Sequence, residues 1–135
     1  MPKPIHKQTK IVLHGKTVSV DTIILPLIKY FNKIKGVKTT TCCGGGNTKK
    51  ETLFPYLCWS CSDIMSRYFI HDFIKKFTKC SKSMIHYSFN FEIENGHVIK
   101  EQFHMWFPLG QKQILKFQKF VLKFPRGVTD KHERL

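Results

Sequence analysis

The chain has 135 residues, a length typical of one domain, with 23 Lys and Arg against nine Asp and Glu and a formal net charge of +14. No run of about 18 apolar residues occurs, which excludes a membrane-spanning helix, and residues 1–7 lack the apolar segment of a secretory signal. We therefore expect a cytoplasmic or nuclear protein, not a secreted one, with polyanions such as RNA, DNA or a nucleotide as partners.

The apolar patterns predict one domain over residues 10–125, with a flexible terminus at 1–9 and a polar tail at 126–135. Six segments have the alternation or β-branched content of strands: 11–13, 17–20, 37–41, 55–61, 84–93 and 97–107. Three segments have the amphipathic period of helices: 21–35, 62–79 and 110–124. Asp21 is expected to cap the first helix with its side chain, and Ser62 or Asp63 the second. These elements predict an α/β (α+β) fold with one mixed, mostly antiparallel sheet and about three helices packed on it.

The most distinctive segment is a β-branched strand that ends in two Cys and three Gly. Consecutive glycines at a strand end form a loop whose bare backbone N–H groups a ligand can approach closely. We expect this loop to hold a phosphate or the end of a nucleotide. Its residues are Thr41, Cys42, Cys43, Gly44, Gly45 and Gly46.

The five cysteines are an odd set, which argues against a disulfide scaffold. Cys42-Cys43 followed by Cys58-x-x-Cys61 invites a structural zinc site. Residues three apart on a strand point to opposite faces, however, so small buried side chains in the sheet are the favoured interpretation, with no metal bound. A nucleophilic Cys42 or Cys43, with a pKa lowered by the loop N–H groups and the many lysines, is a further alternative.

Residues 84–107 predict a long hairpin around Asn95-Gly96. A two-residue Asn-Gly turn would place polar groups on the apolar face of the hairpin. A three-residue loop, which opposes Tyr87 to Phe103, is the favoured register because register follows burial. Glu101 remains a misfit on the apolar face in this register.

The outer face of the same hairpin is polar. In the favoured register His86 and His104 oppose each other directly there, and Trp106 lies at the end of the face. Such a face has the composition to stack a base or hold a phosphate, although a polar sheet face is more often simply solvated. Trp59 and Trp106 are the two candidates for stacking on a base.

Two predicted helices carry rows of cations, and in the second helix Arg67, His71 and Lys75 follow at spacings of four on its polar side. The last predicted helix has lysines at i, i+4, i+7 and i+11 without acidic partners, which favours contact with a sugar-phosphate backbone. A basic amphipathic helix also suits an anionic membrane surface, and that alternative stays open. The predicted nucleic-acid-binding residues are Lys112, Lys116, Lys119, Lys123, Arg67, Lys75 and Trp106.

Four segments together resemble the start of the tRNA wybutosine-synthesis methyltransferase family, over about a third of the chain: Val20-Asp21, Pro26-Leu27-Ile28, Phe31-Asn32 and Thr39-Thr40-Thr41-Cys42-Cys43-Gly44. The resemblance implies motif roles for Asp21, Thr41, Cys42 and Gly44, whereas the Arg of the family motif falls at Gly45 here. The layout is also similar to small uncharacterised phage and viral proteins, in which a strand like Pro55-Tyr56-Leu57 follows, and this implies a viral source.

The expected function is therefore a small basic protein that binds nucleic acid, with RNA as the favoured partner and no cofactor. The resemblance implies one alternative, an S-adenosylmethionine-dependent tRNA-modifying enzyme. A host-directed protein-interaction module, whose partner has an acidic surface, is the other alternative.

Overall fold

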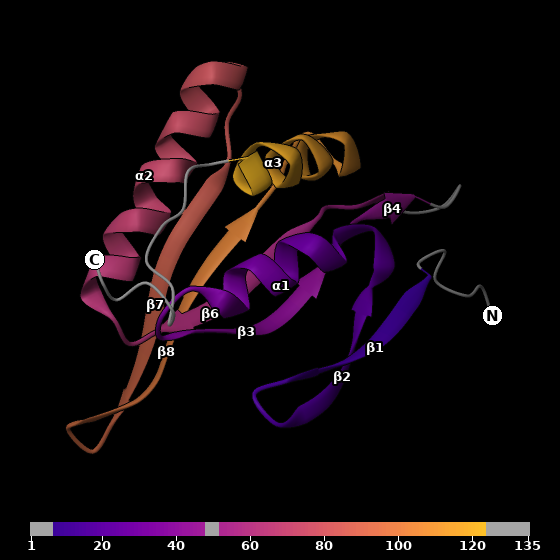
Figure 1. Cartoon of the computed structure of the whole chain (residues 1–135). Coiled ribbons are helices and arrows are strands. Elements are labelled where there is room, and N and C mark those ends of the chain that lie inside the picture. The colour runs from indigo at the N-terminus through magenta and orange to yellow at the C-terminus, as the bar shows by residue number, and fades with distance from the viewer. Residues whose placement is uncertain (1–6, 48–51, 124–135) are drawn as a thin grey trace.

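The computed structural model describes residues 7–47 and 52–123 and has an α+β fold (Figure 1). The strands are β1 (Gln8–Leu13), β2 (Lys16–Asp21), β3 (Val37–Cys43), β4 (Gly46–Asn47), β5 (Thr52–Leu53), β6 (Tyr56–Cys61), β7 (His86–Glu94) and β8 (His97–Trp106). The helices are the 3₁₀ turn η1 (Thr22–Ile24), α1 (Leu25–Lys33), α2 (Ile64–Ser81) and α3 (Gln111–Lys123). The predicted fold class is confirmed.

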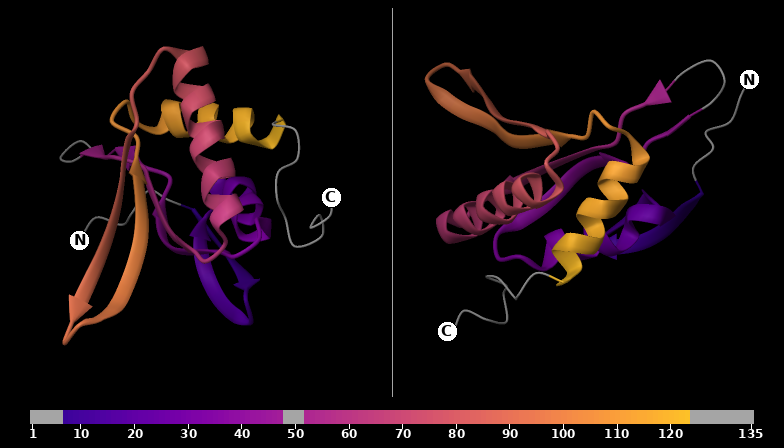
Figure 2. Two further views of the ribbon diagram at one scale, coloured as in Figure 1. Left: turned by 90° about the vertical axis from the view of Figure 1, so that its left-hand side faces the viewer. Right: turned by 90° about the horizontal axis from the view of Figure 1, so that it is seen from above.

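The central sheet has the order β3-β6-β8-β7, while β1–β2 and β4–β5 form separate pairs, and all these pairs are antiparallel. The three α-helices pack on one face of the central sheet, which we call the covered face (Figure 2). None of the described helices lies over the other face, which we call the open face. Within residues 7–47 and 52–123, no helix is both long and apolar enough to cross a membrane.

The core lies between the covered face and the helices. Its centre is Trp59 of β6, whose ring lies 5.0 Å from the Phe31 ring of α1 and stacks on Phe103 of β8 at 5.6 Å. Phe73 of α2 and Phe117 of α3 close the cluster, with ring centroids 5.9 Å apart. Burial of every second strand residue thus fixes which side chains point to the helices and which point to the open face.

The helix termini differ from the prediction at Asp21 and agree with it at Asp63. Asp63 caps α2, since its Oδ2 accepts the Ser66 N–H at 2.9 Å. Asp21 makes no capping bond to the following turn, and the chain there begins as 3₁₀ before α1. The buried Asp21 carboxylate instead accepts the N–H of Gly44, 23 residues away, at 2.7 Å. The predicted capping role of Asp21 is therefore wrong.

The β7–β8 register also differs from the favoured prediction. Asn95-Gly96 form a two-residue turn with φ of 53° and 80°, and Glu94 opposes His97. A bulge between Glu92 and Ile93 then shifts the register by one residue, so that Phe89 opposes Phe103. The predicted three-residue loop is wrong, because one extra residue in β8, Ile99, reconciles a tight turn with apolar pairing.

The ends of the described chain bear on the predicted domain boundaries. Gln8 and Thr9, predicted to be part of a flexible terminus, belong to β1 and pair with β2. Residues 1–6 and the predicted polar tail at 126–135 lie outside the described residues.

Candidate nucleic-acid interface

The open face is built by the alternate residues of four strands. Pairing places Tyr56 beside Trp106 and Cys58 beside His104, and it places Trp106 beside His86 on the far strand. Because neighbours in register point to the same side, these residues share one face with the following polar residues: Lys38, Thr41, Ser60, Ser88, Asn90, Glu92, Lys100 and Gln102. The face therefore combines rings, hydroxyls and cations, a composition that suits an anionic ligand with flat groups.

Five aromatic rings form a connected cluster at one end of this face, which we call the ring cluster. Trp106 is at its centre, with ring centroids 5.0 Å from His86, 6.2 Å from His104 and 6.3 Å from Phe54. Tyr56 extends the cluster, 6.1 Å from His104. Trp106 is 40% exposed and Phe54 is 49% exposed. Large rings left in solvent beside one another are what base stacking requires.

The two histidines do not oppose each other as predicted. His86 opposes Trp106 and His104 opposes Ser88, because the turn has two residues and β8 bulges at Ile99. Both nevertheless lie on the open face, and a cavity of about 270 Å³ lies among the following residues: His86, Tyr87, Ser88, His104 and Trp106. The histidines therefore border the same small cavity as the exposed tryptophan.

A larger cavity of about 510 Å³ lies at the other edge of the open face, between the β1–β2 hairpin and strands β3 and β6. His14 and Lys16 line it from the hairpin, and Lys38 lines it from β3. Hydroxyl-bearing residues Ser19, Thr40, Thr41 and Ser60 also line it and can donate or accept hydrogen bonds. Tyr56 borders both this cavity and the ring cluster, so the two are continuous.

The glycine loop has internal partners for the N–H groups that were expected to meet a phosphate. Gly44 N–H donates to Asp21, and Gly45 N–H donates to Cys43 Sγ at 3.4 Å. The carbonyls of Gly44 and Gly45 accept from Gln111 Nε2 at 3.4 and 3.0 Å, so the loop is tied to the start of α3. A buried carboxylate at this position repels a phosphate. Of the predicted loop residues, we keep Thr41, which faces the 510 Å³ cavity.

Other loop residues serve the fold. Gly46 begins β4 and pairs with Leu53 of β5. Gly44 is closely packed, since an added Cβ would lie 3.0 Å from Ile23. The loop is therefore part of the scaffold beside the open face.

The thiols lack the properties of a nucleophile. Burial, with a smaller contribution from the Asp21 carboxylate, raises the pKa of the Cys42 thiol from 9.0 to about 12. Burial also raises the pKa of the Cys43 thiol. The lowered pKa expected for a catalytic cysteine is therefore contradicted at both positions.

The other cysteines bear on the zinc alternative. Cys58 lies on the open face of β6 and Cys61 on its covered face, as expected for residues three apart. Within the described residues, no group of three or more His, Cys, Asp or Glu is placed to hold a metal ion.

The lysine row of α3 lies on the side of that helix turned away from the core. The buried residues Ile114, Phe117 and Val121 form the side of α3 that meets the core. The four lysines lie on the opposite side of the helix and are all exposed: Lys112, Lys116, Lys119 and Lys123. They line neither of the two cavities described above.

The two cations predicted on α2 are also on the helix side of the sheet. Arg67 is partly buried and bonded to Glu101 at 3.3 Å, and Lys75 is exposed. Sequence reasoning missed Phe54, Tyr56, Lys16, Lys38 and Lys100. The alternation of residues 56–61 carried a signal for Tyr56, but it did not show which side the helices cover.

The residues that carry the family resemblance contact one another. Asp21 binds Gly44, and the Asn32 side chain both accepts the Thr39 N–H at 3.1 Å and donates to Thr39 Oγ1 at 2.9 Å. These bonds join β2, α1 and β3 and explain the motif as structural contacts, while the activity implied by the resemblance stays a prediction. No family model, curated protein or solved structure matches the chain.

Proposed function

We propose that this protein binds single-stranded nucleic acid, RNA by preference, on the open face of its central sheet. The observation that carries the proposal is the ring cluster, five connected rings on a face that no described helix covers. A chain of net charge +14 attracts polyanions, and exposed rings on a sheet stack unpaired bases.

A single strand suits this surface better than a duplex does. The bases of a duplex are stacked on each other, so their flat faces are not available to Trp106 or Tyr56. RNA is favoured over DNA because hydroxyl groups of Ser19, Thr41 and Ser60 line the cavity beside Tyr56. Such groups donate to and accept from the ribose 2′-hydroxyl, which DNA lacks.

The lysine row of α3 has a supporting role in this proposal. It lies on the side of the molecule away from the open face, so one short strand does not contact both surfaces. Its four uncompensated charges raise the positive potential around the whole domain and speed the encounter with a polyanion. Its effect on affinity is therefore expected to be small and strongly screened by salt.

Tryptophan fluorescence tests the proposal directly. Trp59 is 1% exposed and Trp106 is 40% exposed, so quenching by an added oligouridylate reports on Trp106. We expect quenching by a single strand of about eight nucleotides and weaker binding of a duplex of equal length.

The matched variants are Trp106→Ala and Leu109→Ala. Leu109 is 66% exposed and lies outside the sheet, so it controls for loss of an exposed apolar side chain. Measured by anisotropy of a labelled oligonucleotide, Trp106→Ala is expected to weaken binding by about 5- to 150-fold, the value of one stacked base. Failure of the unmodified protein to bind the strand in low salt, or equal effects of the two variants, would overturn the proposal.

A further inference from the structure

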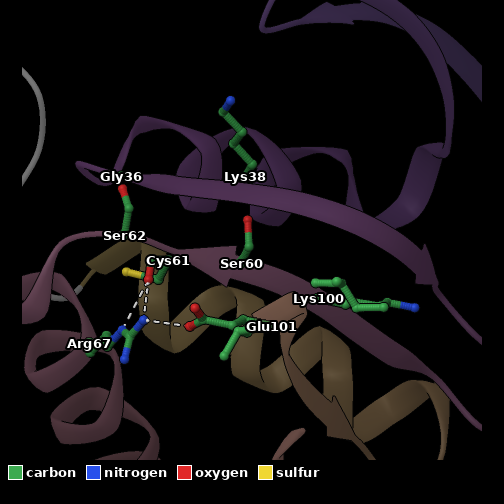
Figure 3. A pocket seen from close by; sticks show the side chains of 10 residues that line it. Gly36, Lys38, Ser60, Cys61, Ser62, Arg67, Lys100 and Glu101 are labelled. Atoms are coloured by element: carbon green, nitrogen blue, oxygen red, sulfur yellow. Dashed lines mark hydrogen bonds and ion pairs between the residues drawn. The ribbon is translucent and has the colours of Figure 1, made fainter. Parts of the chain in front are cut away.

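The central sheet divides at one end. β6 pairs with β8 from Tyr56 opposite Trp106 to Trp59 opposite Phe103. β6 continues to Cys61 and pairs with β3 there, while β8 pairs with β7 along its whole length. The two halves of the sheet therefore separate beyond Trp59, and we call the gap between them the fork. It holds a cavity of about 530 Å³ (Figure 3).

Arg67 of α2 holds the fork open on the covered side. Its Nε and Nη2 donate to the Cys61 carbonyl at 3.0 and 2.8 Å, and Nη2 also bonds Glu101 of β8 at 3.3 Å (Figure 3). The guanidinium lies over the rings of Phe89 and Phe103, 5.6 and 5.4 Å from their centroids. Because Arg67 occupies the Cys61 carbonyl, that group is not available to β8. Specific contacts of Arg67 therefore keep β6 and β8 apart at the fork.

The walls of the fork carry cations that belong to the open face. Lys38 extends from β3 and Lys100 from β8, on opposite sides of the gap (Figure 3). Glu101 is already bonded to Arg67, and no described ion pair involves Lys38 or Lys100. The Ser60 side chain lies between the two lysines, and Ser62 lines the cavity beside Gly36 (Figure 3). Lysines and hydroxyls without an acidic partner are typical contacts of phosphate oxygens.

We propose that the fork holds phosphates of the same strand whose bases stack on the ring cluster, an inference that rests on the proposed function. The two regions are continuous, since Lys38 and Ser60 line both the fork and the cavity bordered by Tyr56. The two ends of the open face then bind different parts of the strand. The ring cluster holds bases, and the fork holds the sugar-phosphate backbone.

The distance between the two ends sets the shortest ligand. Trp106 and Lys100 are six residues apart on β8, which corresponds to roughly 20 Å. A strand must have about four nucleotides to occupy both ends, the lower limit of site sizes on comparable surfaces. The substrate class is therefore a single strand of at least this length, and mononucleotides and dinucleotides bind at one end only.

The salt dependence of binding separates the fork from the ring cluster. We compare Lys38→Gln/Lys100→Gln with Lys116→Gln/Lys119→Gln, which removes the same charge from exposed residues of α3. Each lost phosphate contact lowers the slope of log K against log salt by about 0.7 for a single strand. The fork variant is expected to lower the slope by about 1.4 with a strand of eight or so nucleotides, and the α3 variant by less than half as much.

Ligand length gives a second readout. The unmodified protein is expected to prefer the longer strand to a dinucleotide at least tenfold, and the fork variant is expected to lose most of this preference. Equal slopes and equal length preference in the two variants would overturn the inference. If binding still depends on Trp106 in that case, the proposed function stands and only the fork is wrong. If Trp106→Ala binds as the unmodified protein does, the proposed function itself fails.

Discussion

Trp59 on β6 and Trp106 on β8 lie on opposite faces of the same sheet, and their surroundings differ in kind. Trp59 is 1% exposed, and its ring is stacked almost parallel to Tyr87 and Phe103, at interplanar angles of 18° and 13°. Trp106 is 40% exposed and meets His86 at 89° and His104 at 74°. Parallel rings on the covered face use each other as partners, whereas edge contacts on the open face leave flat ring surfaces to solvent.

The comparison shows that ring count alone does not locate a binding surface. The sequence has 12 Phe, four Tyr and two Trp, and many of these rings fill the core. What distinguishes the open face is that its rings contact one another and that no helix within residues 7–47 and 52–123 lies above them. Whether a ring is covered depends on which face of the sheet the helices pack against, and this is determined by the tertiary structure.

The largest expected effect is a difference in stability between variants of the two tryptophans. If this difference is not observed, the contrast drawn between Trp59 and Trp106 is wrong. Trp59→Ala removes a fully buried ring and should lower the free energy of unfolding by about 3–5 kcal/mol. Trp106→Ala removes an exposed ring and should change it by less than about 1 kcal/mol. Urea denaturation followed by circular dichroism measures both values. Similar losses for the two variants would mean that the open face is a packing surface.

A second prediction concerns Arg67, a charged residue that packs against the covered face of the sheet. Arg67→Met keeps much of the apolar stem but leaves the Cys61 carbonyl and Glu101 without their partner. We expect a loss of about 1–3 kcal/mol. Adding Glu101→Met should restore part of it, because the unpaired acid is then gone, and a double-mutant cycle measures this coupling. Additive losses would show that Glu101 is simply solvated.

Local signals predicted the elements that depend on near neighbours. Asp63 caps α2 as expected, and α3 occupies the predicted amphipathic segment almost residue for residue. Asp21 has an equally good capping sequence, yet its carboxylate binds Gly44 instead. The competing partner comes from β3, 23 residues away, and no local pattern reveals it.

The site was harder to predict for the same reason. The bulge at Ile99 changes which residues oppose His86 and His104, and a bulge leaves no clear mark on the alternation. The fork exists because Arg67, predicted to lie on a polar helix surface, turns toward the sheet and takes the Cys61 carbonyl. The cation rows were readable from sequence, but the face of the molecule that each row occupies was not.

A third prediction concerns Tyr30, on the helix side of the sheet, and the dependence of stability on pH. Burial raises the pKa of Tyr30 on α1 from 10.0 to about 12, and its Oη has no hydrogen-bond partner among the described residues. In the unfolded chain Tyr30 ionises near pH 10, whereas in the folded chain it stays protonated to about pH 12. The unfolded state therefore binds fewer protons in this range, so stability falls as pH rises from 10 to 12.

Tyr30→Phe tests that account. Below pH 10 the variant should be more stable by about 1 kcal/mol, because an unpaired buried hydroxyl is removed. Its advantage should grow between pH 10 and 12, since this titration no longer opposes folding. Thermal unfolding across this range, monitored by circular dichroism, gives both quantities. A variant that loses stability at neutral pH would show that the hydroxyl is satisfied in solution.

The smallest expected effect sharpens the comparison of the open face with the far side of the molecule. Lys112→Gln/Lys123→Gln removes two of the four exposed charges, at the ends of the α3 row, and neither residue lines the fork or the cavity beside Trp106. Because these charges act through long-range attraction, we expect a two- to fivefold slower association with an oligouridylate in about 50 mM salt and no change at 200 mM. The dissociation rate should stay the same, because no contact with the bound strand is lost. Stopped-flow anisotropy separates the two rates. A faster dissociation of the variant would mean that α3 touches the strand, and the bound ligand would then have to pass from the open face around the edge of the sheet to the helices.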